Sequence, residues 1–213
     1  MAQRRDTQKQ TQQKNNKKNT KIGAIVWGIV LAVVLAAAVF FASNYHQDIK
    51  QRVQNAQYPL SYSEYVEKYA KEFDLDPALV YAVMRTESSF NPEAESPAGA
   101  YGLMQITADT LDLYMSMRGE EGKYTVEDLF EPSVNIEYGC AILRDLLNDF
   151  GDEKCAVAAY NAGPGNVYAW LADPAISPDG KTLIVKNIPF EETRSYVQRV
   201  ESAKEKYLEL YYQ

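Results

Sequence analysis

The sequence predicts a mainly α-helical domain of about 150 residues with at most a small β-hairpin, preceded by a single transmembrane helix. Three observations support this prediction. Apolar residues recur every three or four positions after residue 61, several segments open with helix-capping residues, and one run near the start carries no charge. With 46% hydrophobic and 12% aromatic residues, the chain has enough apolar material for a core and is expected to be globular.

The uncharged run is residues 22–42, IGAIVWGIVLAVVLAAAVFFA. As a helix it would span a hydrocarbon layer of about 30 Å, so we assign residues 22–43 as a transmembrane helix. The alternative is a cleaved signal peptide. The apolar region of a signal peptide is typically about 7 to 15 residues long, and no convincing small-x-small cleavage site follows this run, so an uncleaved anchor is preferred.

The flanks of this run predict its orientation. Residues 1–21 hold seven lysines or arginines and one aspartate, and their polar composition predicts a disordered arm. The positive-inside rule then places the N-terminus in the cytoplasm, and everything after about Ser43 outside a single-pass cell-membrane anchor. The arm either contacts anionic lipid headgroups or, as we prefer, serves only as a topology signal. Residues 44–60 are predicted to be a stalk, and residues 61–213 the folded domain.

Composition excludes several function classes. The formal net charge is −7, and residues after 21 hold 15 basic and 28 acidic side chains, so nucleic acid is not an expected partner. The single histidine, His46, lies beside the predicted membrane helix. No Ser-His-Asp or Cys-His machinery, zinc-ligand cluster or Walker loop can be assembled, and no metal is expected. Acid/base chemistry by carboxylates remains, and glycoside cleavage is its commonest form.

The two cysteines, Cys140 and Cys155, could form a disulfide outside the membrane. Cys140 precedes the turn at Gly151 by about ten residues, whereas Cys155 follows it by only about four. In an antiparallel helix pair they would lie at different heights. We therefore predict two small buried hydrophobic side chains and no disulfide.

Helices are predicted from apolar spacing and from capping residues. Asp76 and Pro77 mark the start of one helix, and Gly151 marks the end of another. The apolar or amphipathic faces of three helices comprise Tyr65, Tyr69 and Phe73; Ile136, Cys140, Leu143, Leu147 and Phe150; and Val197, Val200, Lys204, Tyr207 and Tyr211. Strand evidence is limited to residues 175–185, where a turn at 177–180 could make one hairpin.

Glu87 is the candidate for acid/base chemistry. It follows Val80 by seven residues, Val83 by four and Met84 by three, so it lies on the apolar face of its helix. Desolvation there would raise the pKa of the carboxyl, as a general acid near neutral pH requires. The alternative is a glutamate at a helix end, partly exposed or paired with a cation such as Arg85. Periodicity alone leaves both interpretations open.

Three further segments are candidates for a binding site. Residues 96–105 contain two glycines and a proline, so they form a turn that either lets a polymer lie against the backbone or is an ordinary tight loop. Residues 156–165 form a helix of small residues that presents Tyr160 and Asn161 at its end. Residues 189–196 begin the last helix, where Glu192 suits the helix dipole.

Taken together, these segments resemble the SLT-type family of lytic transglycosylases, whose catalytic domain is a helical relative of goose-type lysozyme. The resemblance covers about residues 61 to 200. In chain order it is carried by Glu87-Ser88-Ser89-Phe90-Asn91-Pro92, Ser96, Gly99-Ala100-Tyr101-Gly102-Leu103-Met104-Gln105, Asn135 with Gly139, Ala159-Tyr160-Asn161-Ala162-Gly163-Pro164-Gly165, Ile188-Pro189-Phe190, Glu192-Thr193-Arg194 and Tyr196-Val197.

The resemblance implies a lysozyme-like helical fold and cleavage of the MurNAc-GlcNAc β-1,4 bond of peptidoglycan, with formation of 1,6-anhydro-MurNAc ends. Glu87 would protonate the leaving oxygen and then act as base. No cofactor is implied, and the family lacks the second nucleophilic carboxylate of ordinary retaining glycosidases. The residues implied to line the glycan cleft are Ser96, Gln105, Tyr160, Asn161, Glu192 and Tyr196.

Two rival functions remain at this point. One is a hydrolytic muramidase of the same fold, in which Glu192 is the nearest candidate to hold a water. The other is a non-catalytic glycan-binding or scaffolding protein, against which the intact Glu87 argues. Partners that hold the enzyme in check are expected, because uncontrolled cleavage would lyse the cell, but no motif names them. Cell-wall and secretion-machinery proteins are the candidates. Residues 113–131, including Met115, Met117 and Arg118, have no interpretation from the sequence.

Overall fold

The computed structural model describes residues 27, 31, 33–50 and 52–212, and the chain divides into two compact units, Met1–Gln57 and Tyr58–Gln213. In the first unit, residues 33–50 and 52–57 are helical, which includes most of the predicted stalk. The described residues contain no helix that is long and apolar enough to cross a membrane. The predicted basic tail and part of the predicted transmembrane helix lie outside the described residues, so both stay predictions.

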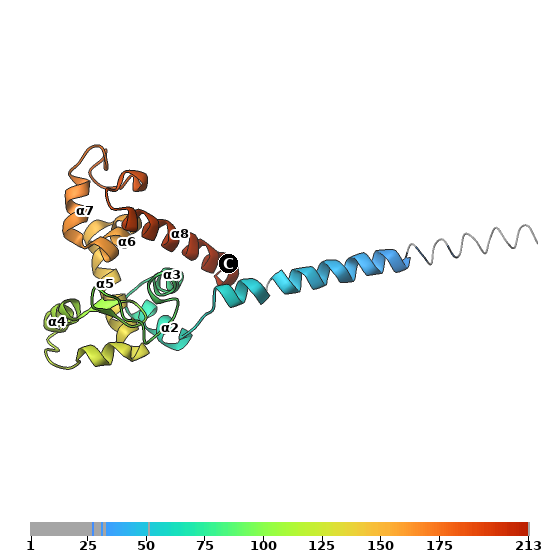
Figure 1. Ribbon diagram of the computed structural model, residues 1–213, viewed down its shortest axis with the longest axis horizontal. Helices are drawn as coiled ribbons and strands as arrows, with labels where there is room; N and C mark the ends of the chain where they lie inside the picture. The colour runs from blue at the N-terminus through green and yellow to red at the C-terminus, as the bar shows by residue number, and fades with distance from the viewer. Residues whose placement is uncertain (1–26, 28–30, 32, 51, 213) are drawn as a thin grey trace, which may run out of the picture. The chain divides into compact units, whose positions relative to one another are not determined.

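The second unit is built mainly from helices with one small hairpin, which confirms the predicted fold class for this part of the chain (Figure 1). Its α-helices are α2 (Ser63–Glu72), α3 (Pro77–Ser88), α4 (Ala108–Met117), α5 (Pro132–Phe150), α6 (Glu153–Ala162), α7 (Pro164–Leu171) and α8 (Glu191–Tyr211). The shorter elements are the strands β1 (Ala100–Tyr101) and β2 (Ile106–Thr107) and the 3-10 helices η1 (Val126–Phe130) and η2 (Val185–Asn187).

The hairpin does not lie where the sequence predicted it. Strand β1 lies inside the glycine-containing segment 96–105, which was expected to form a turn, and it pairs antiparallel with β2 directly after that segment. The prediction of a hairpin at residues 175–185 is wrong. There the Asp179 carboxylate accepts hydrogen bonds from the backbone amides of Lys181 at 2.9 Å and Thr182 at 2.8 Å. These side-chain bonds occupy the donors that a strand ladder would need, so the segment forms turns.

The predicted helix ends are confirmed where their capping residues can be checked. The Asp76 side chain accepts a hydrogen bond from the Ala78 amide at 2.9 Å, and Pro77 occupies the first turn of α3. Helix α5 ends at Phe150 and is capped by Gly151, whose φ of 64° lies in the left-handed region that favours glycine. The helix that carries Glu87 therefore begins at a position set by local sequence.

Helix α3 lies at the centre of the core. Residues 78–84 are all buried, and the helix packs against α2 and α8. Helix α8 contributes Val197, Val200 and Tyr207 to the same core. Cys140 and Cys155 are buried and free, which confirms the prediction of two buried side chains without a disulfide.

Within residues 113–131, Arg118 and Glu120 belong to a partly buried ion-pair network. Helix α4 ends at Met117, and the next residue, Arg118, donates to the Glu137 carboxylate of α5 at 2.5 Å and pairs with Glu120 at 3.2 Å. The Tyr138 hydroxyl donates to Glu120 at 2.7 Å. Arg118 therefore attaches the loop after α4 to the long helix α5.

Candidate active site

Glu87 lies in the last turn of α3 and is half-buried. The hydroxyl of Tyr196, a buried residue of α8, donates a hydrogen bond to its Oε1 atom at 2.6 Å. Residues 109 positions apart in the chain are thus joined by the packing of two helices. The predicted position of Glu87 on a buried helix face is confirmed.

The pKa of the Glu87 carboxyl is raised to about 7, and burial is the largest cause. The hydrogen bond from Tyr196 and the positive charge of Arg199 act in the opposite direction, whereas the negative charge of Glu192 raises the pKa further. A carboxyl with a pKa near the working pH can both give and take a proton, which suits general acid/base chemistry. The guanidinium of Arg85, the cation considered as an ion-pair partner for Glu87, lies over the Tyr58 ring at 4.2 Å from its centroid.

Tyr160 interacts electrostatically with Glu87. Its buried hydroxyl donates to the Met104 carbonyl at 2.8 Å, and the pKa of Tyr160 is raised by burial and then by the negative charge of Glu87. The structure therefore brings together four of the predicted site residues, Glu87, Tyr160, Glu192 and Tyr196. Glu192 itself is exposed in the first turn of α8.

The other predicted site residues make hydrogen bonds within their own segments. The Ser96 hydroxyl accepts from the Ala100 amide at 3.1 Å, and the Gln105 amide donates to the carbonyls of Ala94 at 3.1 Å and Gly102 at 2.9 Å. Gln105 has a φ of 51°, which is uncommon for a residue other than glycine. These contacts hold the shape of the loop between α3 and α4.

Asn161, the remaining predicted site residue, is tied to α8. Its side-chain oxygen accepts a hydrogen bond from the hydroxyl of Thr193 at 2.7 Å, and Thr193 is buried. This contact joins the end of α6 to the first turn of α8. It fixes the segment of α8 that carries Glu192 and Tyr196.

Asn135 of α5, which sequence reasoning did not place in the site, holds the loop between α3 and α4. Its side-chain amide donates to the carbonyls of Tyr101 at 2.9 Å and Leu129 at 2.8 Å, and its oxygen accepts from the Met104 amide at 2.7 Å. Asn135 is fully buried on α5. The sequence did carry a signal for this role, because Asn135 is a polar residue among the apolar residues of its helix. A buried side-chain amide needs hydrogen-bond partners, so it indicates a contact with polar backbone groups of another segment.

The loop is also joined directly to the helix of Glu87. The hydroxyl of Ser88 donates to the Leu103 carbonyl at 2.8 Å. Gly102 lies beside this contact with a φ of +73°, and a Cβ atom there would come within 2.2 Å of the Leu129 carbonyl oxygen. The glycine is therefore required for the close approach of the loop to η1 and α5.

Within the described part of the chain, no cluster of three or more His, Cys, Asp or Glu side chains is placed to hold a metal ion. The site itself contains the half-buried carboxyl of Glu87 and the tyrosines around it. A half-buried carboxyl of near-neutral pKa in a helical domain is typical of acid/base enzymes.

Comparison with known proteins identifies the group within this class. Residues 64–181 match the Transglycosylase SLT domain, and the chain belongs to this family, as its motifs indicated. It is 37% identical over 144 residues to the soluble lytic murein transglycosylase of Escherichia coli K12, which covers 67% of this chain and 22% of that protein. It is 34% identical over 169 residues to the membrane-bound lytic murein transglycosylase C of Actinobacillus pleuropneumoniae serotype 5b, which covers 70% of this chain and 46% of that protein.

Solved structures agree with this assignment. The 70-kDa soluble lytic transglycosylase of Escherichia coli matches with a TM-score of 0.67 and 33% identity, over 73% of this chain and 25% of that one. The lytic transglycosylase Slt of Pseudomonas aeruginosa matches with a TM-score of 0.66 and 35% identity, over the same shares of the two chains. This chain thus spans less than half the length of these relatives.

Proposed function

We propose that this chain is a lytic transglycosylase that cleaves the MurNAc-GlcNAc β-1,4 bond of peptidoglycan and leaves 1,6-anhydro-MurNAc ends. The observation that carries the proposal is Glu87, a half-buried carboxyl with a pKa of about 7, held by Tyr196 in a domain of the SLT family. The names of the relatives, lytic murein transglycosylases, describe the same reaction class.

The proposed reaction needs one proton donor that becomes the base. Protonated Glu87 gives its proton to the glycosidic oxygen as the bond from that oxygen to C1 of MurNAc breaks. The N-acetyl group of the sugar stabilises the cationic centre at C1. The C6 hydroxyl oxygen then bonds to C1 while its proton returns to the Glu87 carboxylate, so the enzyme is regenerated without water or cofactor. Because Tyr196 occupies Oε1, we assign the proton transfers to Oε2.

Six residues are proposed to line the glycan cleft around Glu87. The loop residues Ser96 and Gln105 would present backbone and polar groups to the sugar rings, and Tyr160, Asn161, Glu192 and Tyr196 would complete the wall formed by α6 and α8. Glu192 is the residue that separates this proposal from its nearest rival. In a muramidase, the exposed Glu192 carboxylate would hold the attacking water.

The test is the chemistry of the sugar ends. The chain and its Glu87→Gln variant are incubated with purified peptidoglycan, and the released ends are identified by mass spectrometry. We expect anhydro-muramic ends from the wild type and a loss of at least about 10³-fold in the variant, because the acid is removed. Glu93→Gln, which neutralises an exposed glutamate in the following loop, is the matched control and should retain full activity.

Each other outcome identifies a rival. Reducing ends from the wild type would make the protein a muramidase. Binding to peptidoglycan without release of any product would favour a glycan-binding or scaffolding protein. Equal products from wild type and Glu87→Gln would remove Glu87 from the mechanism.

We also propose that residues 22–43 anchor the chain in the cell membrane, with the N-terminus in the cytoplasm and the catalytic domain outside. The support is the uncharged run and the basic flank before it. Membrane fractions washed with alkaline carbonate should retain the chain, and protease added to spheroplasts should digest residues 58–213. Release by the wash, or protection from the protease, would count against this placement. The cell-wall or secretion-machinery partners stay a prediction.

A further inference from the structure

Helix α3 ends in an uncommon backbone conformation directly after Glu87. Ser89 has a φ of 52° and Phe90 has a φ of 66°, so two consecutive residues other than glycine lie in the left-handed region. This region is unfavourable for residues with a Cβ atom, because that atom comes too close to a backbone carbonyl. The end of the helix that carries Glu87 is therefore strained.

The strained pair is held by contacts on both sides. The Ser89 amide donates to the Arg85 carbonyl at 3.1 Å, and the Asn91 amide donates to the Ser88 carbonyl at 3.1 Å. The half-buried ring of Phe90 packs against the hydrophobic core. A strained backbone persists only where its surroundings determine it in this way, and such strain is concentrated at functional sites.

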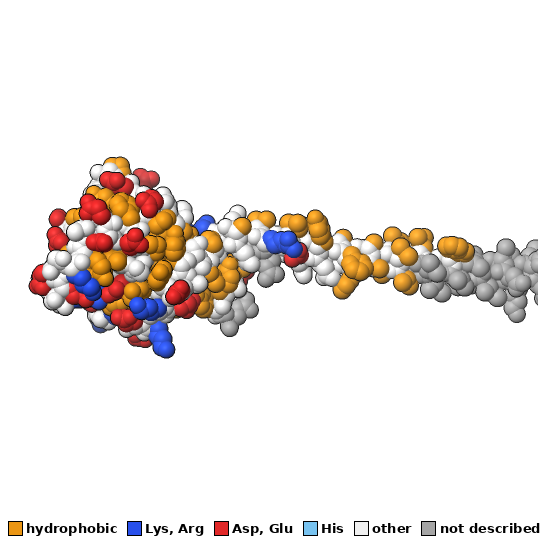
Figure 2. Space-filling model, turned by 90° about the horizontal axis from the view of Figure 1, so that it is seen from below, with side chains coloured by type: hydrophobic (Ala, Val, Ile, Leu, Met, Phe, Trp, Pro, Cys, Tyr) orange, Lys and Arg blue, Asp and Glu red, His pale blue; other side chains and the backbone are white. Residues whose placement is uncertain are grey.

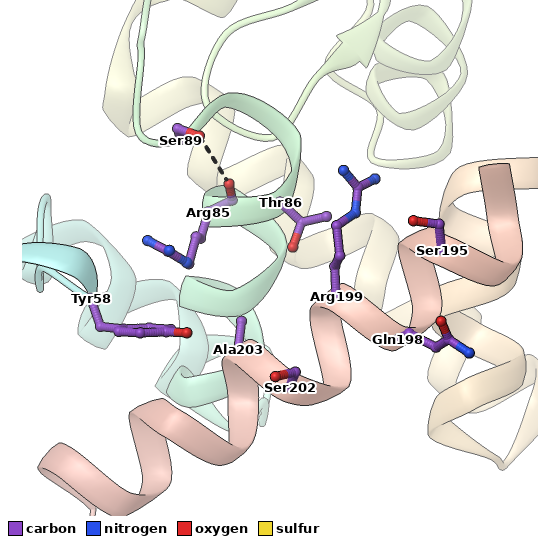
Figure 3. A pocket seen from close by; sticks show the side chains of 9 residues that line it. All are labelled: Tyr58, Arg85, Thr86, Ser89, Ser195, Gln198, Arg199, Ser202 and Ala203. Carbon is purple, nitrogen blue, oxygen red and sulfur yellow. Dashed lines mark hydrogen bonds between the residues drawn. The ribbon is translucent and has the colours of Figure 1, made fainter. Parts of the chain in front are cut away.

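The side chain of Ser89 does not explain why a serine stands here. Ser89 is exposed, and its hydroxyl reaches the Arg85 carbonyl only at 3.5 Å, the dashed line in Figure 3. It lies at a cavity of about 450 Å³ between α3 and α8, which Arg85 and Arg199 also line. A glycine would adopt this backbone conformation without strain and would lose almost no contact.

Serine and glycine differ in the freedom that they leave to the backbone. The left-handed region open to a residue with a Cβ atom is small, whereas glycine also moves freely into the regions around it. Two confined residues in succession fix where α3 ends and where the next loop begins. Glu87 lies in the last turn of α3, where a helix would otherwise fray, and its bond to Tyr196 requires a fixed carboxyl.

We propose that Ser89 and Phe90 are positioning residues, whose confined left-handed backbone holds the last turn of α3 and so keeps the Glu87 carboxyl in the orientation for proton transfer. The proposal rests on the proposed function, since it takes Glu87 to be the acid/base. The fold is less stable at this point, and the carboxyl occupies a narrower range of positions. A misplacement of about 1 Å is enough to lower a catalytic rate by about 100-fold.

The test is Ser89→Gly in the whole chain, assayed on soluble glycan strands. The midpoint of urea unfolding should rise, because relief of the left-handed strain exceeds the entropy that glycine adds to the unfolded chain. At the same time kcat should fall about tenfold with little change in KM. A serine with a purely structural role would give the first change without the second.

Asp74→Gly is the matched control. Asp74 is exposed, has the same φ of 52° and also follows a helix end, that of α2. Its contact with Arg144 at 3.5 Å is exposed and contributes little. Figure 2 shows many acidic side chains on the visible face of the second unit, so the loss of one carboxylate changes the surface charge little. This variant should gain stability and keep the wild-type kcat.

Ser89→Asn separates confinement of the backbone from strain. Asparagine tolerates the left-handed conformation better than serine does, yet it keeps a Cβ atom and a restricted backbone. It should therefore be more stable than the wild type and should recover most of the kcat that Ser89→Gly loses.

The pH profile is an independent measurement. In Ser89→Gly the carboxyl of Glu87 should be less consistently buried, so its pKa should fall and the basic limb of the kcat profile should move to lower pH. The variants leave in place the charged and titratable groups that act on Glu87, which are Tyr160 of α6 and Glu192, Tyr196 and Arg199 of α8.

The outcomes are distinct. No product from the wild type would overturn the proposed function and the positioning role with it. Cleavage by Ser89→Gly with the wild-type kcat and an unmoved limb would overturn only the positioning role. Equal losses of kcat in Ser89→Gly and Asp74→Gly would do the same, because the effect would then not depend on the neighbourhood of Glu87. A less stable Ser89→Gly would show that the serine is not strained, which also contradicts the proposal.

Discussion

Glu87 is subject to opposing influences that come from different parts of the chain. Burial at the end of α3 raises the pKa of its carboxyl, whereas the hydroxyl of Tyr196 and the charge of Arg199 on α8 lower it. The balance, a pKa of about 7, lets one side chain serve as acid and base in turn. The acidity of the residue is thus set mainly by packing.

Tyr196→Phe should shift the pH dependence of activity upward. The change removes a hydrogen bond that favours the charged carboxylate, so the pKa of Glu87 should rise above about 7. The basic limb of the kcat/KM profile should then move to higher pH by about one unit. Tyr168→Phe, which removes an exposed hydroxyl that donates to Asp149 at 2.5 Å, is the control and should not move the limb. A limb that stays or moves to lower pH in Tyr196→Phe would contradict the assignment.

Glu87→Gln should make stability less dependent on pH. The pKa of this carboxyl is 4.5 in an unfolded reference and about 7 in the folded state, so the folded state binds more protons between these values. Stability should therefore fall as the pH rises from about 4.5 to about 7 and should stay low above this range. Glutamine lacks the ionisation but can still accept the hydrogen bond from Tyr196.

The measurement is urea unfolding of both proteins at two pH values. At pH 8.5 the variant should be more stable by about 1–3 kcal/mol, and at pH 4 the two should nearly agree. The same difference at both pH values would mean that the ionisation of Glu87 does not affect folding.

At the scale of the element, the loop between α3 and α4 is held by side chains from other elements. Asn135 of α5, Tyr160 of α6 and Ser88 of α3 all bond to the backbone of residues 101–104. The short hairpin supplies little cohesion of its own. The shape of the proposed glycan cleft consequently depends on these contacts.

Two glycines of similar backbone conformation test this dependence. Gly102→Ala should destabilise the protein by about 2–4 kcal/mol, because the new Cβ atom would meet the Leu129 carbonyl oxygen at 2.2 Å and the φ of +73° is unfavourable. Gly122→Ala has a φ of +72° but nothing within 4 Å, so it should cost only about 1 kcal/mol. Urea unfolding measures the stability of both variants. Equal losses of stability would show that the positive φ, and not contact with Leu129, determines the cost of Gly102→Ala.

At the scale of the whole molecule, the compact unit begins at Tyr58, three residues before the predicted domain boundary at 61. The Tyr211 hydroxyl donates to the Tyr58 carbonyl at 2.8 Å, and the Tyr207 hydroxyl donates to the Pro59 carbonyl at 3.2 Å. The Tyr58 ring also packs edge-on against Tyr207 at 5.5 Å. The first residues of the unit are therefore attached to the last turns of α8.

A chain of residues 58–213 should fold cooperatively, because the core lies within this unit. A chain of residues 61–213 should also fold but be less stable by about 1–3 kcal/mol, since it lacks the aromatic contact and both carbonyl acceptors. Thermal and urea unfolding of the two chains provide the comparison. Equal stability would mean that Tyr58 and Pro59 contribute nothing to the fold.

The sequence by itself determined the local features of this protein. Asp76, Pro77 and Gly151 act on their own helix ends, and the spacing of Val80, Val83 and Glu87 determines which face of a helix is buried. These features depend on residues within one or two helical turns, so periodicity and capping rules can predict them. The family followed from motifs read in chain order.

The tertiary structure decided which of these local features meet. Glu87 of α3 contacts Tyr196 of α8, and Asn135 of α5 holds the loop between α3 and α4. Arg85 of α3 and Arg199 of α8 line one cavity. The position of the hairpin could not be predicted from the sequence, because it also depends on contacts between elements. Gly102, between its two strands, packs against Leu129 and α5. A periodic pattern specifies that a face is buried, but the partner of that face is selected by the packing of the whole core.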